Sequence, residues 1–351
     1  MPLEPPELPR TPPTPPLPAP RGPLSGFVIE HLRRPVHALP PAPRGDDPLF
    51  GEDAPLALYL AYELHYRGFE GVDEAWEWEP SLLALRRSLE EGFLAAVAAA
   101  VGPLPEAFDV PTHLLALTAD GDGPSLSAFM ATSGTREQFR EFAVHRSAYQ
   151  LKEADPHSWA LPRLDGQAKA ALVEIQADEY GQGVERDMHA TLFAQTMHAL
   201  GLDTRYGAYL DVIPGLTLST VNLISLFGLH RRWRGALVGH LAVFEMTSVE
   251  PMGRYSMALR RLRYGPWARL FFDTHVVADA HHQLVAAREL AGGLVRREPQ
   301  LATDVLFGAH AIMAVEGAFT RHLLSSWQAG RGSLLGPVPA VAPPQQRLRT
   351  A

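Results

Sequence analysis

The chain has 351 residues, of which 46% are hydrophobic, and this is enough for one large core or two smaller ones. Its net charge of −8 comes from 39 acidic and 31 basic residues without a long block of one sign, which argues against nucleic acid as a partner. The chain has no cysteine. Disulfides, cysteinyl zinc sites, iron–sulfur clusters and a thiol nucleophile are therefore excluded, and a metal would have to be held by His, Asp and Glu.

The composition of the two ends differs from that of the rest of the chain. Residues 1–43 hold 15 of the 32 prolines, which predicts a disordered, Pro-rich leader, and residues 333–351 are expected to form a flexible tail. No signal-peptide pattern is present, and the longest apolar run, FLAAVAAAVG, is too short to span a bilayer. We therefore expect a cytoplasmic protein with no membrane partner.

Between these ends, apolar residues recur three and four positions apart, which predicts helices. Helices are expected at 55–69, 80–102, 135–153, 166–181, 184–201, 221–230, 234–247, 266–290 and 303–327. No run of alternating polar and apolar residues flanked by hairpin turns is found, so the predicted fold is an all-α bundle. We expect a boundary near residue 135, between an N-terminal helical region (44–135) and a second domain (136–332).

Polar residues interrupt the apolar face of the helix expected at 266–290. In the stretch DTHVVADAHH, His275, Asp279 and His282 stand at i, i+4 and i+7, within roughly 60° on one helical face. Asp273 and His281 point elsewhere. Imidazole nitrogen and carboxylate oxygen are ligands for iron, manganese or zinc. This trio is therefore either half of a metal site or a solvated polar face.

Four further polar residues lie on or near apolar faces of other predicted helices. Glu245 sits within the apolar stripe of 234–247 and His189 heads that of 184–201. Glu153 follows the apolar side of 135–153, and Glu179 shares a face with Leu172. A buried carboxylate needs a cation or a metal as partner. Each residue taken alone is more often a satisfied core or helix-end group than a ligand.

Several motifs of known chemistry are absent from the sequence. His-Glu-x-x-His, Walker A, G-x-G-x-x-G and G-x-S-x-G do not occur, and neither does the Glu-x-x-His that ferritin-like di-iron bundles require. The segment ELHYRG, residues 63–68, places Glu63 and His65 on different helical faces. We interpret it as a structural or interdomain contact.

The pattern of His-x₃-Asp-x₂-His with acidic and His residues upstream resembles the haem-oxygenase-like di-iron oxidases and oxygenases, the iron-containing redox enzymes. The resemblance covers about residues 136–330 and implies a haem-oxygenase-like helical bundle. It implies that the ligands are Glu153, His189, Glu245, His275, Asp279 and His282, with Glu179 as an additional carboxylate. Glu185, one turn before His189, competes with Glu179 for that additional role.

The same resemblance implies two Fe(II) ions, dioxygen as co-substrate and oxidation of a small organic substrate with an electron donor that the sequence does not identify. A mixed manganese–iron site or zinc is compatible with these ligand types. Haem-binding proteins and non-catalytic helical binding proteins of the same fold are alternatives. A homodimer formed through the N-terminal helices is a further hypothesis.

Overall fold

Helices form the secondary structure of the residues that the computed structural model describes, which are 8, 14–105, 109–119 and 123–339, and no strand occurs among them. The all-α prediction is confirmed. The helices of more than a few residues are α1 (Pro23–Leu32), α2 (Asp53–Glu63), α3 (Pro80–Val101), α4 (Val110–Ala119), α5 (Leu126–Thr132), α6 (Arg136–Gln150), α8 (Gly166–Glu179), α9 (His189–Ala199), α10 (Gly215–Leu229), α11 (Arg234–Arg261), α12 (Pro266–Leu284), α13 (Gly292–Arg297) and α14 (Ala302–Gln328).

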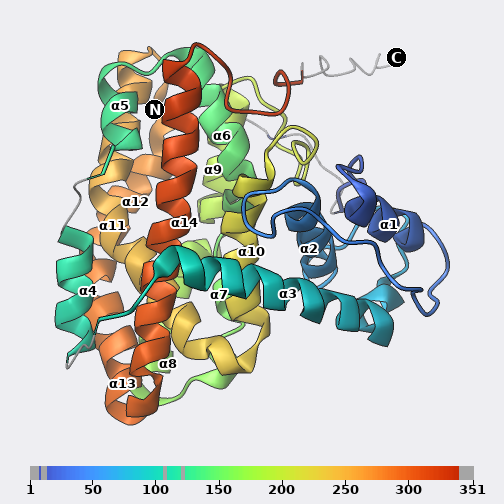
Figure 1. Cartoon of the computed structure of the whole chain (residues 1–351). Coiled ribbons are helices and arrows are strands. Elements are labelled where there is room, and N and C mark those ends of the chain that lie inside the picture. The colour runs from blue at the N-terminus through green and yellow to red at the C-terminus, as the bar shows by residue number, and fades with distance from the viewer. Residues whose placement is uncertain (1–7, 9–13, 106–108, 120–122, 340–351) are drawn as a thin grey trace, which may run out of the picture.

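The long helix α11 packs along both α12 and α14, and these three helices form the main body of the bundle (Figure 1). Two glycines let α11 and α14 approach closely. A Cβ atom at Gly239 would lie 1.9 Å from the carbonyl oxygen of Val305, and one at Gly308 would lie 1.9 Å from that of Ala236. α11 also continues through Pro251, so it extends well beyond the helix that the sequence predicts there.

The N-terminal helices pack against the same bundle. α2 lies along α10, and α3 crosses α14 (Figure 1). Two apolar clusters form the core, and each contains residues from both sides of residue 135: Leu56 joins Phe142 in one, and Phe93 joins Leu223 in the other. Contacts thus connect the two predicted regions, while the boundaries assigned to them stay predictions.

The prediction of a disordered leader over residues 1–43 is wrong for residues 23–32, which form α1. Its side chains Leu24, Val28 and Ile29 are buried. Pro23 suits the first turn of a helix, where its missing N–H is not needed. The carboxylate of Asp53 accepts hydrogen bonds from the backbone N–H groups of Leu24 and Ser25 at 2.9 and 2.7 Å. Residues 1–7 and 9–13 of the predicted leader lie outside the described residues.

The predicted flexible tail is anchored where it begins. Ser333 is buried, its backbone N–H donates to Glu141 at 2.8 Å, and the N–H of Leu335 donates to the carbonyl of Val212 at 2.8 Å. The prediction is therefore wrong for these first residues, because a hydrogen-bonded, buried serine ties them to the bundle. Residues 340–351 lie outside the described residues.

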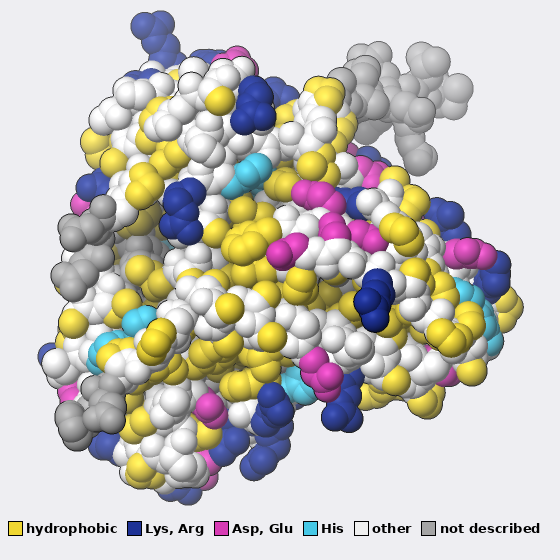
Figure 2. Space-filling model, viewed as in Figure 1, with side chains coloured by type: hydrophobic (Ala, Val, Ile, Leu, Met, Phe, Trp, Pro, Cys, Tyr) yellow, Lys and Arg dark blue, Asp and Glu magenta, His cyan; other side chains and the backbone are white. Residues whose placement is uncertain are grey.

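Among the described residues, one helical stretch, Pro299–Gln328, is long and apolar enough to cross a bilayer by length and composition alone. It consists largely of α14, whose buried face packs against α11. A core helix passes the same test, so the stretch is weak evidence for a membrane span. On the described part of the face in Figure 2, Lys and Arg side chains lie dispersed without a continuous basic surface. The exclusion of nucleic acid and membrane partners stays a prediction.

Candidate metal centre

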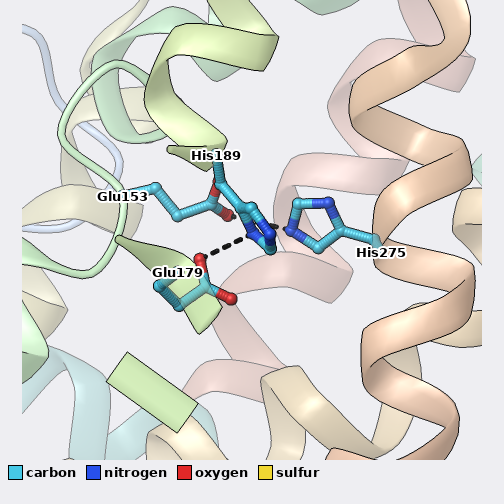
Figure 3. A group of neighbouring side chains, drawn as sticks. All are labelled: Glu153, Glu179, His189 and His275. Atoms are coloured by element: carbon cyan, nitrogen blue, oxygen red, sulfur yellow. Dashed lines mark ion pairs between the residues drawn. The ribbon is translucent and has the colours of Figure 1, made fainter. Parts of the chain in front are cut away.

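The seven residues that the resemblance implies as ligands lie together in two groups. One group consists of Glu153, Glu179, His189 and His275, whose side chains point toward one another (Figure 3). The second consists of Glu245, Asp279 and His282. Within each group, one nitrogen or oxygen atom from every residue lies within 4.8 Å of the others. Each group therefore has the size and donor chemistry of a site for one metal ion.

The helix α12 supplies residues to both groups. His275, Asp279 and His282 form its buried polar face, whereas Asp273 and His281 are exposed, as their helical spacing predicts. A π-helical segment, Val285–Ala291, follows directly after α12. Such π segments often occur at functional sites.

Glu153 lies in a turn after α6, which ends at Gln150, and not on the helix that the sequence predicts through residue 153. The next residue, Ala154, has φ of 73°. A residue with a Cβ atom adopts this left-handed region only at an energetic cost, so the surrounding structure must hold the turn. The carboxylate of Glu153 approaches Nε2 of His275 at 3.6 Å.

Glu179 ends α8 and His189 begins α9, and the loop between them brings the two side chains together. Gly181 makes this loop possible: its φ is 59°, and a Cβ atom there would lie 2.5 Å from the backbone nitrogen of Met188. Oε2 of Glu179 lies 2.9 Å from Nδ1 of His189. Glu185 is exposed on the loop, so of the two competing carboxylates Glu179 is the one beside His189.

In the second group, Nδ1 of His282 faces both carboxylates. It lies 3.2 Å from Oε2 of Glu245 on α11 and 3.6 Å from Oδ1 of Asp279. All three residues are buried. The glutamate that interrupts the apolar stripe of α11 is thus turned toward the polar face of α12.

Six buried atoms at the centre of the two groups make no well-formed hydrogen bond among the described residues, although several lie at ion-pair distance from one another. They are Oε2 of Glu153, Oε2 of Glu179, Nδ1 of His189, Oε2 of Glu245, Oδ1 of Asp279 and Nδ1 of His282. A buried polar atom without a partner costs about 1–3 kcal/mol. The gathering of six such atoms in two groups of His, Asp and Glu side chains fits metal ions as their partners.

The electrostatics of the groups agree with this fit. Burial raises the pKa of Glu153, and burial together with nearby Asp279 raises that of Glu245 to about 8. Burial would also raise the pKa of Glu179, but nearby His189 outweighs it and lowers the value to about 2. The pKa values of Glu153 and Glu179 shift in opposite directions because Glu179 lies 2.9 Å from His189, whereas Glu153 lies 3.6 Å from His275 and the charge of Glu179 adds to its shift upward.

The histidines carry the balancing charge. Burial would lower the pKa of His275, but Glu153 and the other carboxylates raise it to about 10. The pKa of His282 rises in the same way to about 11, through Asp279 and Glu245. Without a metal, protons on these imidazoles offset the negative charge of the carboxylates. A metal ion would take the place of those protons.

For His275 and His282, partners outside the two groups fix which imidazole nitrogen faces inward. Nδ1 of His275 donates to the carbonyl of Phe271 at 2.8 Å, which leaves Nε2 for the first group. Nε2 of His282 pairs with Oδ2 of Asp178 at 2.8 Å, which leaves Nδ1 for the second. Such outer contacts set the tautomer and orientation of metal-binding histidines.

Asp178 is the residue of the site that sequence reasoning misses. It lies with Glu174 on a face of α8 different from that of Glu179, and that face meets α12: Glu174 pairs with His281 at 2.8 Å and Asp178 with His282 at 2.8 Å. The sequence signal for this contact is two acidic residues one turn apart on α8, opposite two adjacent histidines on α12. Sequence alone does not say that these helices pack together.

Fold and site together define a helical-bundle protein with a histidine–carboxylate centre, and comparison with known proteins identifies its family. The model of the family described as iron-containing redox enzyme matches residues 140–317, a span that contains all seven residues of the two groups. The chain belongs to this family, and it is an oxidoreductase of the haem-oxygenase-like all-α fold, so the predicted family and fold are confirmed.

One relative is nitrosourea synthase from Streptomyces achromogenes subsp. streptozoticus. The two chains are 26% identical over 180 residues, which is 51% of this chain and 38% of that protein. The match therefore spans well under half of the relative's length. It supports the family, and the relative's activity is not carried over to this chain.

Proposed function

We propose that this protein is a non-haem di-iron oxidase or oxygenase that uses dioxygen to oxidise a small organic substrate. The observation that carries the proposal is the convergence of buried His and carboxylate atoms in two adjacent groups, six of them without a well-formed hydrogen bond among the described residues. Glu153, Glu179, His189 and His275 would hold one iron. Glu245, Asp279 and His282 would hold the other.

The charges of the ligands support two divalent ions. Four carboxylates, Glu153, Glu179, Glu245 and Asp279, carry four negative charges against the four positive charges of two Fe(II) ions. A formally neutral site is far less costly to bury among apolar side chains than an uncompensated one. The two groups also adjoin, because Glu179 influences the pKa of Glu245 and is itself influenced by His282.

When bound, the two ferrous ions would supply electrons that reduce dioxygen, and the dioxygen activated in this way would oxidise the substrate. The chain supplies geometry and a dry environment. The ring of Phe271 packs against His275 and His189 at centroid distances of 4.3 and 6.4 Å, and Phe193 packs against Phe271 at 5.1 Å. These buried aromatic side chains exclude water from the first group.

A cavity of about 510 Å³ is lined by neighbours in sequence of Glu153 and Glu179, though by none of the candidate ligands themselves, and it supports a small-molecule substrate. Its lining includes Asp155 and Tyr180, which lie two residues after Glu153 and one residue after Glu179. Tyr66 and Trp159 add aromatic surface, and Arg67 adds a positive charge. The volume falls within the range of small-molecule sites, and a largely apolar wall with a few polar groups is typical of them.

The alternatives explain less of the site. Haem binding needs one proximal histidine and would leave the carboxylates beside His189, His275 and His282 unexplained. A non-catalytic binding protein would join its buried polar groups by well-formed hydrogen bonds, whereas six atoms here lie close to one another without such bonds among the described residues. Zinc or a mixed manganese–iron pair would suit the same ligand types. The electron donor, a homodimer and a cytoplasmic location stay predictions.

The test is an anaerobic Fe(II) titration followed by brief exposure to oxygen. We expect about two irons to bind per chain and a transient visible absorption band to form. The variant His275→Ala should lose iron, and the matched control His281→Ala, on the exposed side of the same helix, should not. No saturable iron binding, or a Soret band in protein purified with haem, would overturn the proposal.

A further inference from the structure

A buried ion pair joins the N-terminal region to the turn that carries Glu153. Nζ of Lys152 lies 2.8 Å from Oε2 of Glu63, the first residue of the ELHYRG segment, at the end of α2. The side chains of Lys152 and Glu63 are 2% and 0% exposed. A pair so deeply buried is costly to desolvate, so it needs further partners to be stable.

Three tyrosines supply those partners. The ammonium group of Lys152 lies 4.1 Å from the ring centre of Tyr66, 5.3 Å from that of Tyr59 and 5.8 Å from that of Tyr206. The hydroxyl of Tyr206 donates to Oε2 of Glu63 at 2.8 Å. The aromatic rings and this hydrogen bond hold the ion pair in a fixed position.

The turn itself is held from two sides. The guanidinium of Arg67, the fifth residue of ELHYRG, donates to the carbonyl of Leu151 at 3.1 Å. The amide of Gln176 donates to the carbonyl of Ala154 at 3.0 Å, and Gln176 lies on α8, the helix that carries Glu179. Ala154 has the left-handed φ of 73°, so the turn needs such contacts to keep its conformation.

We infer that Lys152 and Glu63 are positioning residues, which fix the turn at 151–154 so that the carboxylate of Glu153 meets His275. This inference rests on the proposed function and gives the N-terminal region a role in the metal site. The ELHYRG segment thus acts through the backbone of the turn. Neither Glu63 nor Lys152 belongs to the two groups of candidate ligands or to the described lining of the cavity beside Tyr180.

The inference predicts a selective effect. Only the first group depends on the turn, since Glu245, Asp279 and His282 come from the long helices α11 and α12. Loss of the ion pair should therefore weaken metal binding at the first group and leave the second unchanged. A merely stabilising ion pair would affect both groups alike or neither.

The test is a Co(II) titration of the full chain under nitrogen, read by visible absorption. The variants His189→Ala and Asp279→Asn assign the binding steps to the first and second group. The double variant Glu63→Gln/Lys152→Met removes both charges, so neither is left buried without its partner, and Lys152→Arg keeps the pair. The matched control Glu298→Gln breaks another ion pair, with Arg234, that is not attached to a ligand residue.

In the double variant we expect affinity at the first group to fall about 10- to 100-fold, the usual effect of removing a group that orients a ligand, and the second step to stay unchanged. Lys152→Arg and Glu298→Gln should bind like the original chain. The inference would be overturned if the double variant bound metal at both steps as the original chain does, or if it lost affinity equally at both steps. If the original chain itself binds no metal, the proposed function fails with it.

Discussion

The substitution Asp178→Asn tests whether a residue outside the two groups tunes the second one. Oδ2 of Asp178 lies 2.8 Å from Nε2 of His282 and fixes the imidazole with Nδ1 toward Glu245 and Asp279. An asparagine keeps the shape of the side chain but loses the charge. Its amide N–H can also donate to Nε2 of His282, which favours the tautomer with the proton on Nδ1. We expect weaker metal binding at the second group.

The structure sets the size of this effect. Removing the outer partner of a metal-binding histidine typically costs 10- to 100-fold in affinity. The side chain of Asp178 is 37% exposed, so solvent screens part of its charge and the lower end of that range applies. We therefore expect a loss of about tenfold, which corresponds to about 1.4 kcal/mol.

The assay is the same stepwise metal titration, and α8 offers a matched control. Glu174 lies one turn before Asp178 and pairs with His281 at the same 2.8 Å, but both members of this pair are exposed and His281 is not a candidate ligand. Glu174→Gln should leave both binding steps unchanged. An equal effect of the two substitutions, or a loss at the first group in Asp178→Asn, would refute the reasoning about His282.

Three further predictions concern stability. Burial lowers the pKa of His157 from 6.5 to about 3, so below pH 6.5 the unfolded chain binds a proton that the folded chain does not. The free energy of unfolding should therefore fall by up to about 1.4 kcal/mol per pH unit as pH drops below 6.5. Urea unfolding at pH 7 and pH 5 should show a smaller fall for His157→Gln than for the original chain. Gly308→Ala should destabilise by about 1–3 kcal/mol or more through the close contact with α11, whereas Gly317→Ala, whose Cβ would meet only the end of Arg321, should not. Leu24→Ala should cost about 2–5 kcal/mol in chemical denaturation, and no loss would mean that α1 does not pack on the core.

The sequence predicted the long helices and the ligand-bearing face of α12 well. Both depend on local periodicity: apolar residues recur along α11, α12 and α14, and the spacing of His275, Asp279 and His282 places them on one side of a helix in any helical fold. Glu245 was recognisable because a carboxylate interrupts an apolar stripe. Grouping the seven residues required the resemblance, because spacing along the chain does not say which helices meet.

What the sequence did not predict depends on contacts between distant segments. The proline content of the first 43 residues argued against a helix there, so α1 was not predicted. Its first turn is held by Asp53 of α2, whose carboxylate accepts from the N–H groups of Leu24 and Ser25. Glu153 was expected on a helix, but the turn after Gln150 follows from contacts with Arg67 and Gln176. In each case the partner lies more than 20 residues away, beyond the reach of periodicity or local propensity.

The division of α12 between the two groups has a consequence for the centre as a whole. His275 belongs to the first group and Asp279 to the second, and four residues of helix separate their Cα atoms by about 6 Å along the axis. A single rigid helix therefore sets the spacing of the two candidate metal positions. The other ligands of the first group come from a turn and from both ends of a loop, so this group has the less rigid frame. The contacts that hold that turn, from Glu63, Arg67 and Gln176, are accordingly where sequence changes should alter one metal position without moving the other.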